Sequence, residues 1–537
     1  MKETKDLLRQ NRLSSLLVMS LVLGLLAQWV FIGRPLGISW LIFIIVLLAV
    51  LLWNGRRARL QVARRNLWLW PALLFFATMV FWRANPFLTF LNVMATLGLL
   101  AFVFYFYAAG TVSYLSLSGI LTLPLRMGGT TISHVGPVVC ASLAPGTVDQ
   151  GRSRELAPVL RGGVLALPVV VVFAALLASA DLVFSVYLQR VVGLDFAVVT
   201  PYVGRGLFIV LVAGLVAGGT ATAVVRGLRD PQDDESWVEQ MARKMPLHLS
   251  LGAVETGTIL ILVSGLFLAF VLLQFRYLFG GEANIGREGF TYAEYARRGF
   301  SELVLVASLS LALILLLNWL TRRESKRQIK WFNGFSSLLI TLVLLILVTA
   351  FWRMRLYEQA YGYTELRLIV LVFELWLGLL LVWFLITLWR APERFAVGFL
   401  IAAIGFVGTL NLINPDALIV RHNLQRYHES GDLDMAYLTT LSADAVPLLI
   451  AAYDEVEGDV QQIAVPNCYD DDGCTQTMSE LLDGNLHERY DVMLRDRNLL
   501  SGRAYHQARV RASHALTCFV EPEITAVRLG ILNTGCG

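Results

Sequence analysis

Carboxyl groups inside long apolar stretches are the residues of this sequence with the clearest potential for chemistry. Glu374 lies within one such stretch, in VFELW, and Asp181, Glu255 and Glu302 lie near the ends of three others. A charged group at membrane depth costs a few kcal/mol and rarely faces lipid, so it commonly marks a proton or solute site. For the three residues near stretch ends, snorkelling to the interface or structural pairing is the alternative. For Glu374 we predict a role inside a helix bundle.

Two further segments combine arginine, tyrosine and glutamate. In TYAEYARRGFSEL, residues 291–303, a helix would place Glu294, Arg298 and Glu302 four residues apart, as an acid–base–acid ladder. The segment RMRLYEQAYGYTELR, residues 353–367, has the same residue types. Guanidinium groups bind phosphate and carboxylate groups in a bidentate manner.

These segments predict one polar cavity that opens to the outside, built from Asp181, 291–302 and 353–367. The alternative is a salt-bridge network that holds membrane spans together. The candidate ligand-binding residues are Asp181, Glu255, Tyr292, Glu294, Tyr295, Arg297, Arg298, Glu302, Arg353, Arg355, Tyr357, Tyr361, Glu365, Arg367 and Glu374.

Nucleotide and metal motifs are absent from the sequence. It has no GxxxxGK[ST], no GxGxxG after a strand, no HExxH and no CxxC. His422 and His428 are six residues apart, so they lie on different faces of a helix and do not form a zinc pair. The stretch CYDDDGC fails as a calcium loop, because Cys468 and Ser479 would occupy ligand positions. We therefore predict no metal, no cofactor and no nucleic-acid partner. The sequence leaves open whether the protein is an enzyme, and the absence of these motifs favours a protein that is not one.

Membrane spans must position these residues. Of 537 residues, 56% are hydrophobic and 16% are charged, whereas a soluble domain has about 25% charged residues. This composition excludes an ordinary soluble enzyme, a disordered chain and a coiled coil. A span needs about 20 apolar residues, and we predict an all-α, polytopic bundle of about eleven spans. They lie near 14–33, 37–53, 67–82, 87–107, 164–187, 206–225, 252–274, 302–320, 335–352, 366–389 and 395–413.

The distribution of basic residues predicts the orientation. With the N-terminus inside, all five lysines and the runs RRAR, ARR and TRRESKRQIK fall in inside segments, as the positive-inside rule requires. The rule does not require the outside arginines, such as Arg353 and Arg355, which makes them candidates for function. Eleven spans place the C-terminal segment outside.

The chain divides into four predicted parts. They are four spans in 1–107, a cytoplasmic loop in 108–163, a seven-span core in 164–413 and an extracytoplasmic helical tail in 414–537. Four of the five cysteines, Cys468, Cys474, Cys518 and Cys536, fall in the tail. An even set in an exported segment predicts two disulfides, for which three pairings are open. The alternative is four free thiols in a cytoplasmic tail.

Several stretches are similar to a known family. LALPVVVVFAALLASADLVF, LFLAFVLLQFRYLFGG, TYAEYARRGFSELVLVA, RMRLYEQAYGYTELRL and NPDALIVRHNLQRYHESGDLDMAYLTTLSADAVP, from about residue 160 to about 450, resemble bacterial multi-pass membrane proteins. These are the domain-of-unknown-function family four-one-seven-three and its relative four-one-five-three. The first four spans and the last 85 or so residues match less clearly. The resemblance implies a polytopic protein of the bacterial inner membrane and brings no activity or ligand.

These observations favour a transporter-like or ligand-binding membrane protein with an outward-facing polar cavity. Its predicted partners are the lipid bilayer, an anionic solute or lipid headgroup, and a membrane protein. The alternative is an envelope sensor or scaffold that binds protein partners through the 108–163 loop and the tail. An outer-leaflet enzyme acting on a lipid-linked substrate ranks third. Membrane glycosyltransferases place acidic residues in the first outer loop, and the first predicted outer loop of this chain carries none.

Overall fold

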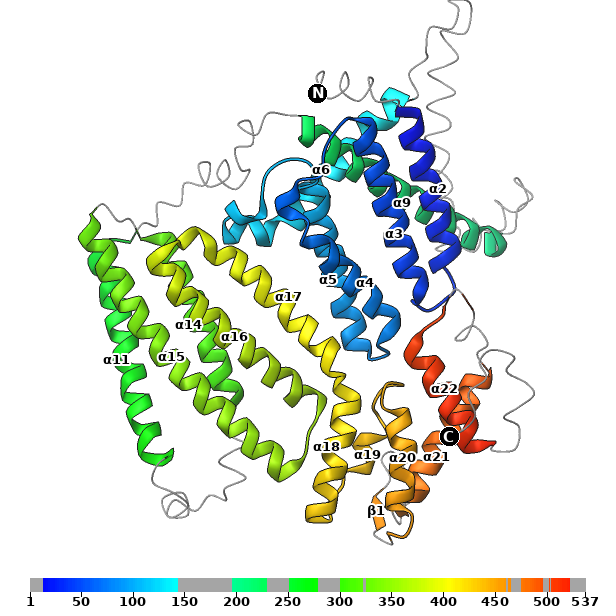
Figure 1. Cartoon of the computed structure of the whole chain (residues 1–537), viewed down its shortest axis with the longest axis vertical. Coiled ribbons are helices and arrows are strands. Elements are labelled where there is room, and N and C mark those ends of the chain that lie inside the picture. Colours follow the sequence, from blue (N-terminus) through cyan, green and yellow to red (C-terminus); the bar gives the residue numbers. More distant parts are fainter. Residues whose placement is uncertain are drawn as a thin grey trace, which may run out of the picture.

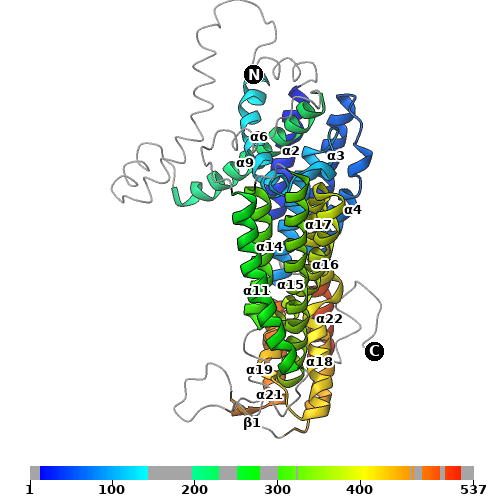
Figure 2. The same cartoon turned by 90° about the vertical axis from the view of Figure 1, so that its left-hand side faces the viewer.

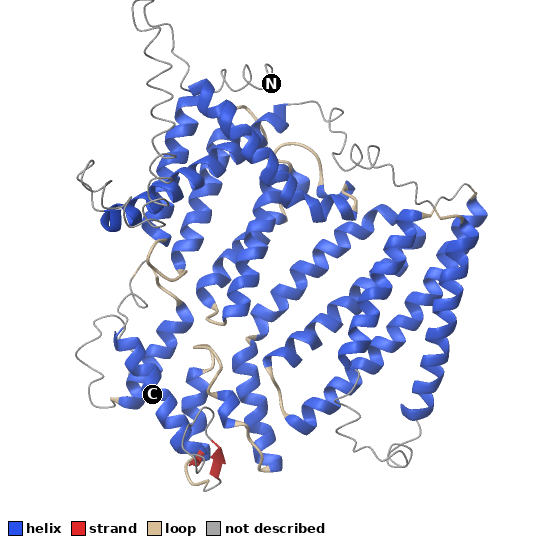
Figure 3. Ribbon diagram, turned by 180° about the vertical axis from the view of Figure 1, so that it is seen from behind, coloured by secondary structure: helices blue, strands red, loops and turns tan. Residues whose placement is uncertain are grey.

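The computed structural model describes residues 13–142, 196–228, 251–278, 300–321, 325–459, 462–464, 475–495, 502 and 504–521. These residues are almost entirely helical, so the predicted all-α class is confirmed (Figure 3). The single described sheet has two antiparallel strands, β1 (Gln462–Ala464) and β2 (Thr475–Thr477).

The first group of helices packs around one core. Its members are α2 (Leu13–Phe31), α3 (Ile38–Arg57), α4 (Leu69–Trp82), α5 (Pro86–Tyr105), α6 (Leu117–Ser142) and α9 (Phe196–Leu228), with the short 3-10 turns η1 (Arg64–Asn66) and η2 (Val112–Tyr114). Helices α2 to α5 run alternately up and down (Figure 1). Leu51, Leu73 and Phe76 lie fully buried between them.

Helix α6 occupies part of the predicted cytoplasmic loop. Residues 117–142 form a helix of 26 residues that packs against α9 and α2. Ile120, Leu123 and Met127 recur at helical spacing and are buried, so they form the face of α6 that packs against the core. Helix α9 approaches α6 so closely that a Cβ at Gly218 would collide with the carbonyl oxygen of Thr131.

The second group of helices forms an up-and-down bundle. It contains α11 (Ala253–Leu278), α14 (Phe300–Leu320), α15 (Lys326–Tyr361), α16 (Glu365–Arg390) and, after the 3-10 turn η5 (Pro392–Arg394), α17 (Phe395–Ile413). Leu251 pairs with Thr321, so the start of α11 and the end of α14 lie at the same end of the bundle. Helix α17 also packs against α5 and thereby joins the two groups (Figures 1 and 2).

Eight described helices are long and apolar enough to cross a bilayer. They cover 38–57, 86–105, 204–228, 253–273, 302–320, 326–361, 365–390 and 392–413, and each overlaps a predicted span. The count of eleven is not confirmed. The stretch 67–82 yields α4 with 14 residues, about 21 Å long, and the apolar part of α2 covers only Leu16–Phe31. The predicted span 164–187 lies outside the described residues.

A small helical tail follows α17 at the end of the bundle where α17 ends (Figure 2). It contains α18 (Pro415–Ser430), α19 (Met435–Leu438), α20 (Val446–Val456), α21 (Met478–Arg495) and α22 (Gln507–Val520). Buried residues such as Met435, Leu449 and Leu482 form a separate hydrophobic core, which also includes Leu368 of α16. The tail is therefore fixed to the bundle through its own core.

Candidate functional site

Three ionisable side chains are buried in the bundle near the turn between α15 and α16. Glu358 is 1% exposed, Glu374 is 2% exposed and Arg353 is 8% exposed. Glu374 lies nine residues after the start of α16 and Arg353 eight residues before the end of α15, so they lie about 14 Å and about 12 Å from the turn. The two packed helices thus bury these groups at similar depth.

The carboxyl group of Glu374 lacks hydrogen bonds to the rest of the described chain, since neither of its oxygens has a partner there. Glu358 lies beside the Tyr363 hydroxyl, which interacts with its carboxyl group. Arg355 lies near Glu358, with 3.8 Å between its Nη1 and one carboxylate oxygen. The two carboxyl groups also interact electrostatically with each other. Buried polar groups are satisfied in the great majority of cases, so the unpaired carboxyl group of Glu374 calls for a functional explanation.

The turn that positions these residues is held by the tail. Gly362 has a φ of +76°, which favours glycine, and a Cβ there would lie 2.6 Å from Asn423 Oδ1. The Tyr363 N–H donates to Asn423 Oδ1 at 2.7 Å, and Asn423 Nδ2 donates to the Tyr363 carbonyl at 2.9 Å. One asparagine of α18 therefore fixes the path from α15 into α16.

Aromatic and guanidinium groups line the solvent side of Glu358. Arg355 Nη1 donates to the Tyr363 hydroxyl at 2.8 Å, and the Tyr363 ring stacks on His422 at 4.8 Å. Burial and the Glu358 charge raise the pKa of Tyr363. Burial and the positive charges of Arg355 and Arg421 lower the pKa of His422. His422 is therefore neutral at neutral pH and does not compete as a cation.

The Arg367 side chain makes its contacts within the α15–α16 turn. Its guanidinium lies 4.0 Å from the centre of the Tyr357 ring and donates to the carbonyls of Tyr361 and Gly362 at 3.3 and 2.5 Å. Tyr357 and Tyr361 are in ring contact at 5.1 Å. These contacts match the structural alternative of a network that holds spans together, so Arg367 is poorly placed to clamp an anion.

The structure brings about half of the predicted site residues to one end. Arg353, Arg355, Tyr357, Tyr361, Glu365, Arg367 and Glu374 gather at the α15–α16 turn, and Glu302 lies in the first turn of α14 at the same end. Glu255 lies at the opposite end, where its carboxylate accepts from the Gly252 N–H at the start of α11. Asp181, Tyr292, Glu294, Tyr295, Arg297 and Arg298 lie outside the described residues, so the single cavity stays a prediction.

The cysteine prediction is only partly covered by the structure. Cys518 lies on α22, where its sulfur is 3.9 Å from His514 Nδ1. Cys468, Cys474 and Cys536 lie outside the described residues, so the disulfide pairing stays a prediction. No group of three or more metal-binding side chains occurs in the described part of the chain.

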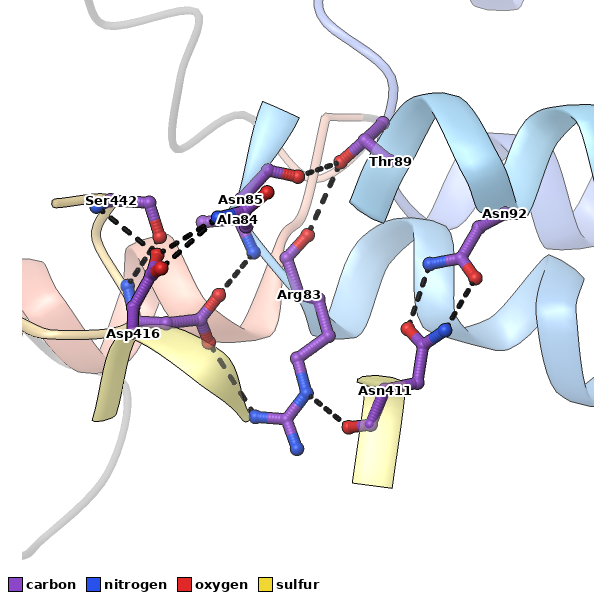
Figure 4. Close-up of polar contacts among 9 residues, drawn as sticks. Arg83, Ala84, Asn85, Thr89, Asn92, Asn411, Asp416 and Ser442 are labelled. Carbon is purple, nitrogen blue, oxygen red and sulfur yellow. Dashed lines mark hydrogen bonds and ion pairs between the residues drawn. The ribbon is translucent and has the colours of Figure 1, made fainter. Parts of the chain in front are cut away.

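A polar network that the sequence did not reveal joins the tail to both helix groups (Figure 4). Arg83, in the turn between α4 and α5, donates to the Asn411 carbonyl at 2.8 Å and lies 3.7 Å from Asp444. Asn85 donates to Glu365 and to Asp416, both at 3.0 Å. Burial raises the pKa of Asp444, opposed by the Ala84 N–H and Arg83.

A pair of buried asparagines extends this network between α5 and α17. Asn92 Nδ2 donates to Asn411 Oδ1 at 2.8 Å, and Asn411 Nδ2 donates to Asn92 Oδ1 at 2.7 Å (Figure 4). Asn-Pro steps at Asn85 and Asn414, together with asparagines inside apolar stretches, are the sequence signals that could have identified the junction. A cavity of about 320 Å³ lies beside it, with Glu365 and Tyr437 in its wall.

The eight apolar helices and their buried carboxyl groups define a multi-pass integral membrane protein. The chain belongs to the family described as domain of unknown function (DUF4153), whose sequence model matches residues 71–452. This is the family predicted as the relative, and it replaces the first-named family, four-one-seven-three. The match begins with α4, earlier than the predicted limit near residue 160. No curated protein and no solved structure matches the chain.

Proposed function

We propose that this protein is a transporter-like or ligand-binding protein of the bacterial inner membrane. In this proposal, Glu374 and Glu358 bind a proton or a small cation at the outer end of α15 and α16. One observation carries it: Glu374 is 2% exposed, and neither of its oxygens has a hydrogen-bond partner among the described residues.

Electrostatics explains why this arrangement suits a binding site. An ionised carboxyl group that is buried without a partner costs several kcal/mol. Arg355 reaches Glu358, and among the described residues the like charge of Glu358 acts on Glu374. A bound proton or cation would remove this repulsion, and its release would restore it. Two states of different stability are what a coupled carrier needs.

The charge distribution supports an outward orientation of this end. Lys326, Lys330, Arg56 and Arg57 lie at the end of the spans opposite to the tail (Figure 1). Basic residues beside spans favour the cytoplasmic side. We therefore place the tail, the α15–α16 turn and the buried carboxyl groups toward the outside.

Carbodiimide labelling tests the proposed site in the full chain. Dicyclohexylcarbodiimide reacts with protonated carboxyl groups in apolar surroundings. We expect it to modify Glu374 in detergent-solubilised protein, more in acidic than in alkaline buffer, as read by peptide mass spectrometry. Asp416 is the internal reference, because it is 1% exposed but accepts hydrogen bonds from Asn85 and Ser442.

The labelling has two further readouts. Protection by sodium would assign a cation site, and dependence on pH alone would assign a proton site. Glu358→Gln should lower the labelling of Glu374, because it removes the neighbouring negative charge that favours the protonated form. Modification of Glu374 no greater than that of Asp416 would refute the proposed site.

The structure also supports a second function, an envelope sensor or scaffold. The tail has its own hydrophobic core and a cavity of about 460 Å³ between α21 and α22, lined by Val492, Met493 and Leu516. Val492 is 53% exposed and is therefore accessible to a partner. A stoichiometric protein partner that is lost in Val492→Asp would favour this function, and purification without a partner would weaken it.

A further inference from the structure

The surface of α15 at the end opposite to the tail carries a groove with basic and apolar walls. It has a volume of about 370 Å³ and is lined by Arg327, Lys330, Trp331, Gly334, Phe335 and Leu338. The groove exists because Gly334 has no side chain: a Cβ there would meet nothing within 4 Å. The Trp331 and Phe335 rings stack at 5.7 Å and form one wall.

The aromatic residues place this groove at a membrane interface. Trp331 is 56% exposed and Trp352 is 55% exposed. They are 21 residues apart on α15, or about 32 Å, which matches a hydrocarbon core of about 30 Å. Trp319 and Trp389, on the neighbouring helices, are also more than half exposed. Tryptophan is enriched at headgroup level, so Trp331 marks one boundary of the hydrocarbon.

The basic residues lie on the headgroup side of this boundary. Arg327 and Lys330 precede Trp331 by four residues and by one residue, and neither forms an ion pair within the described part of the chain. Gly334 and Leu338, which is 46% exposed, lie on the hydrocarbon side. Charge and apolar surface are therefore arranged as in a phospholipid, with the charged part outermost.

We propose that this groove binds one anionic glycerophospholipid. The phosphate contacts Arg327 and Lys330, and one acyl chain lies over Gly334 along Leu338. This site is about the length of a span away from Glu374 and does not depend on the proposed function. Helix α15 thus carries the groove at one end and Glu358 at the other.

Native mass spectrometry of the full chain, released from nanodiscs of phosphatidylglycerol and phosphatidylethanolamine, tests the proposal. We expect one phosphatidylglycerol to be retained by the wild type. A basic residue near an anionic headgroup contributes about 1 kcal/mol, or about fivefold in affinity, so Arg327→Gln with Lys330→Gln should weaken retention roughly 30-fold. The control is Arg390→Gln with Arg394→Gln, two exposed arginines at the same end.

A second pair of variants tests the groove without changing charge. Gly334→Leu fills the groove and should also abolish retention. Gly257→Leu is its match on α11, where a Cβ likewise meets nothing within 4 Å, and it should retain the lipid. Both changes improve helix propensity, so neither should unfold its helix. Equal retention by all variants would overturn the proposal, as would displacement of the lipid by inorganic phosphate alone, which would indicate a simple anion site.

Discussion

The buried Asn92–Asn411 pair predicts a strong energetic coupling between α5 and α17. Both residues are 0% exposed, and each side chain donates to the other, at 2.8 and 2.7 Å. Leucine has nearly the same shape as asparagine but no polar atoms. Asn92→Leu alone would leave the donor and acceptor of Asn411 facing an apolar group. Asn411→Leu would do the same to Asn92.

The magnitude follows from the two hydrogen bonds. A buried polar group that loses its partner costs about 1–3 kcal/mol, so each single variant should lose about 2 kcal/mol of unfolding free energy. The double variant removes both partners and should be no less stable than either single variant. We therefore expect a coupling energy of about 2 kcal/mol, near the upper limit for side-chain hydrogen bonds in membranes, about 1.7 kcal/mol.

Equilibrium unfolding of the four proteins in mixed micelles of dodecylmaltoside and dodecylsulfate measures this cycle. Circular dichroism reports helix loss for the wild type, both single variants and the double variant. Additive losses, with a coupling energy near zero, would show that the two amides do not stabilise the contact between α5 and α17. The packing of these helices would then rest on apolar contacts alone.

Three further changes test other parts of the structure. Burial lowers the pKa of His506 to about 4, so stability should fall by about 3 kcal/mol as pH falls from about 6.5 to about 4; His506→Gln should flatten this slope in thermal unfolding scans. Gly218→Val forces a side chain onto the Thr131 carbonyl and should cost about 1–3 kcal/mol, whereas Gly204→Val meets nothing within 4 Å and should be tolerated. Arg489 donates to two backbone carbonyls at 2.6 and 2.8 Å, so Arg489→Met should loosen the tail and speed its limited proteolysis.

The long apolar helices could be predicted from the sequence because an uninterrupted apolar run is sufficient to define a span. Helices α15 and α16 illustrate this, although α15 extends well beyond the predicted 335–352 at both ends. Helix α6 was not predicted because its stretch of the chain is rich in Gly, Ser, Thr and Pro. Pro124 and Gly128 within it are typical of a loop, and packing against α9 overrides that preference.

The buried position of Glu374 could be anticipated because a lone carboxyl group in an apolar stretch costs too much to face lipid. The junction network could not be anticipated in the same way. It pairs residues that are far apart in the chain: 331 positions separate Asn85 from Asp416, and 319 separate Asn92 from Asn411. Local patterns carry no information on such pairs. The position of Glu255 near one end of its span could be predicted, because it opens the apolar stretch that forms α11.

Acid-driven proton flux in proteoliposomes tests the central claim most directly. The full chain is reconstituted with a pH-sensitive dye inside the vesicles, beside Glu374→Gln and the exposed control Glu393→Gln. The account predicts flux above that of empty vesicles for the wild type and the control, and its loss in Glu374→Gln. Flux in Glu374→Gln equal to that of the wild type would contradict it, and wild-type flux equal to that of empty vesicles would contradict a proton carrier.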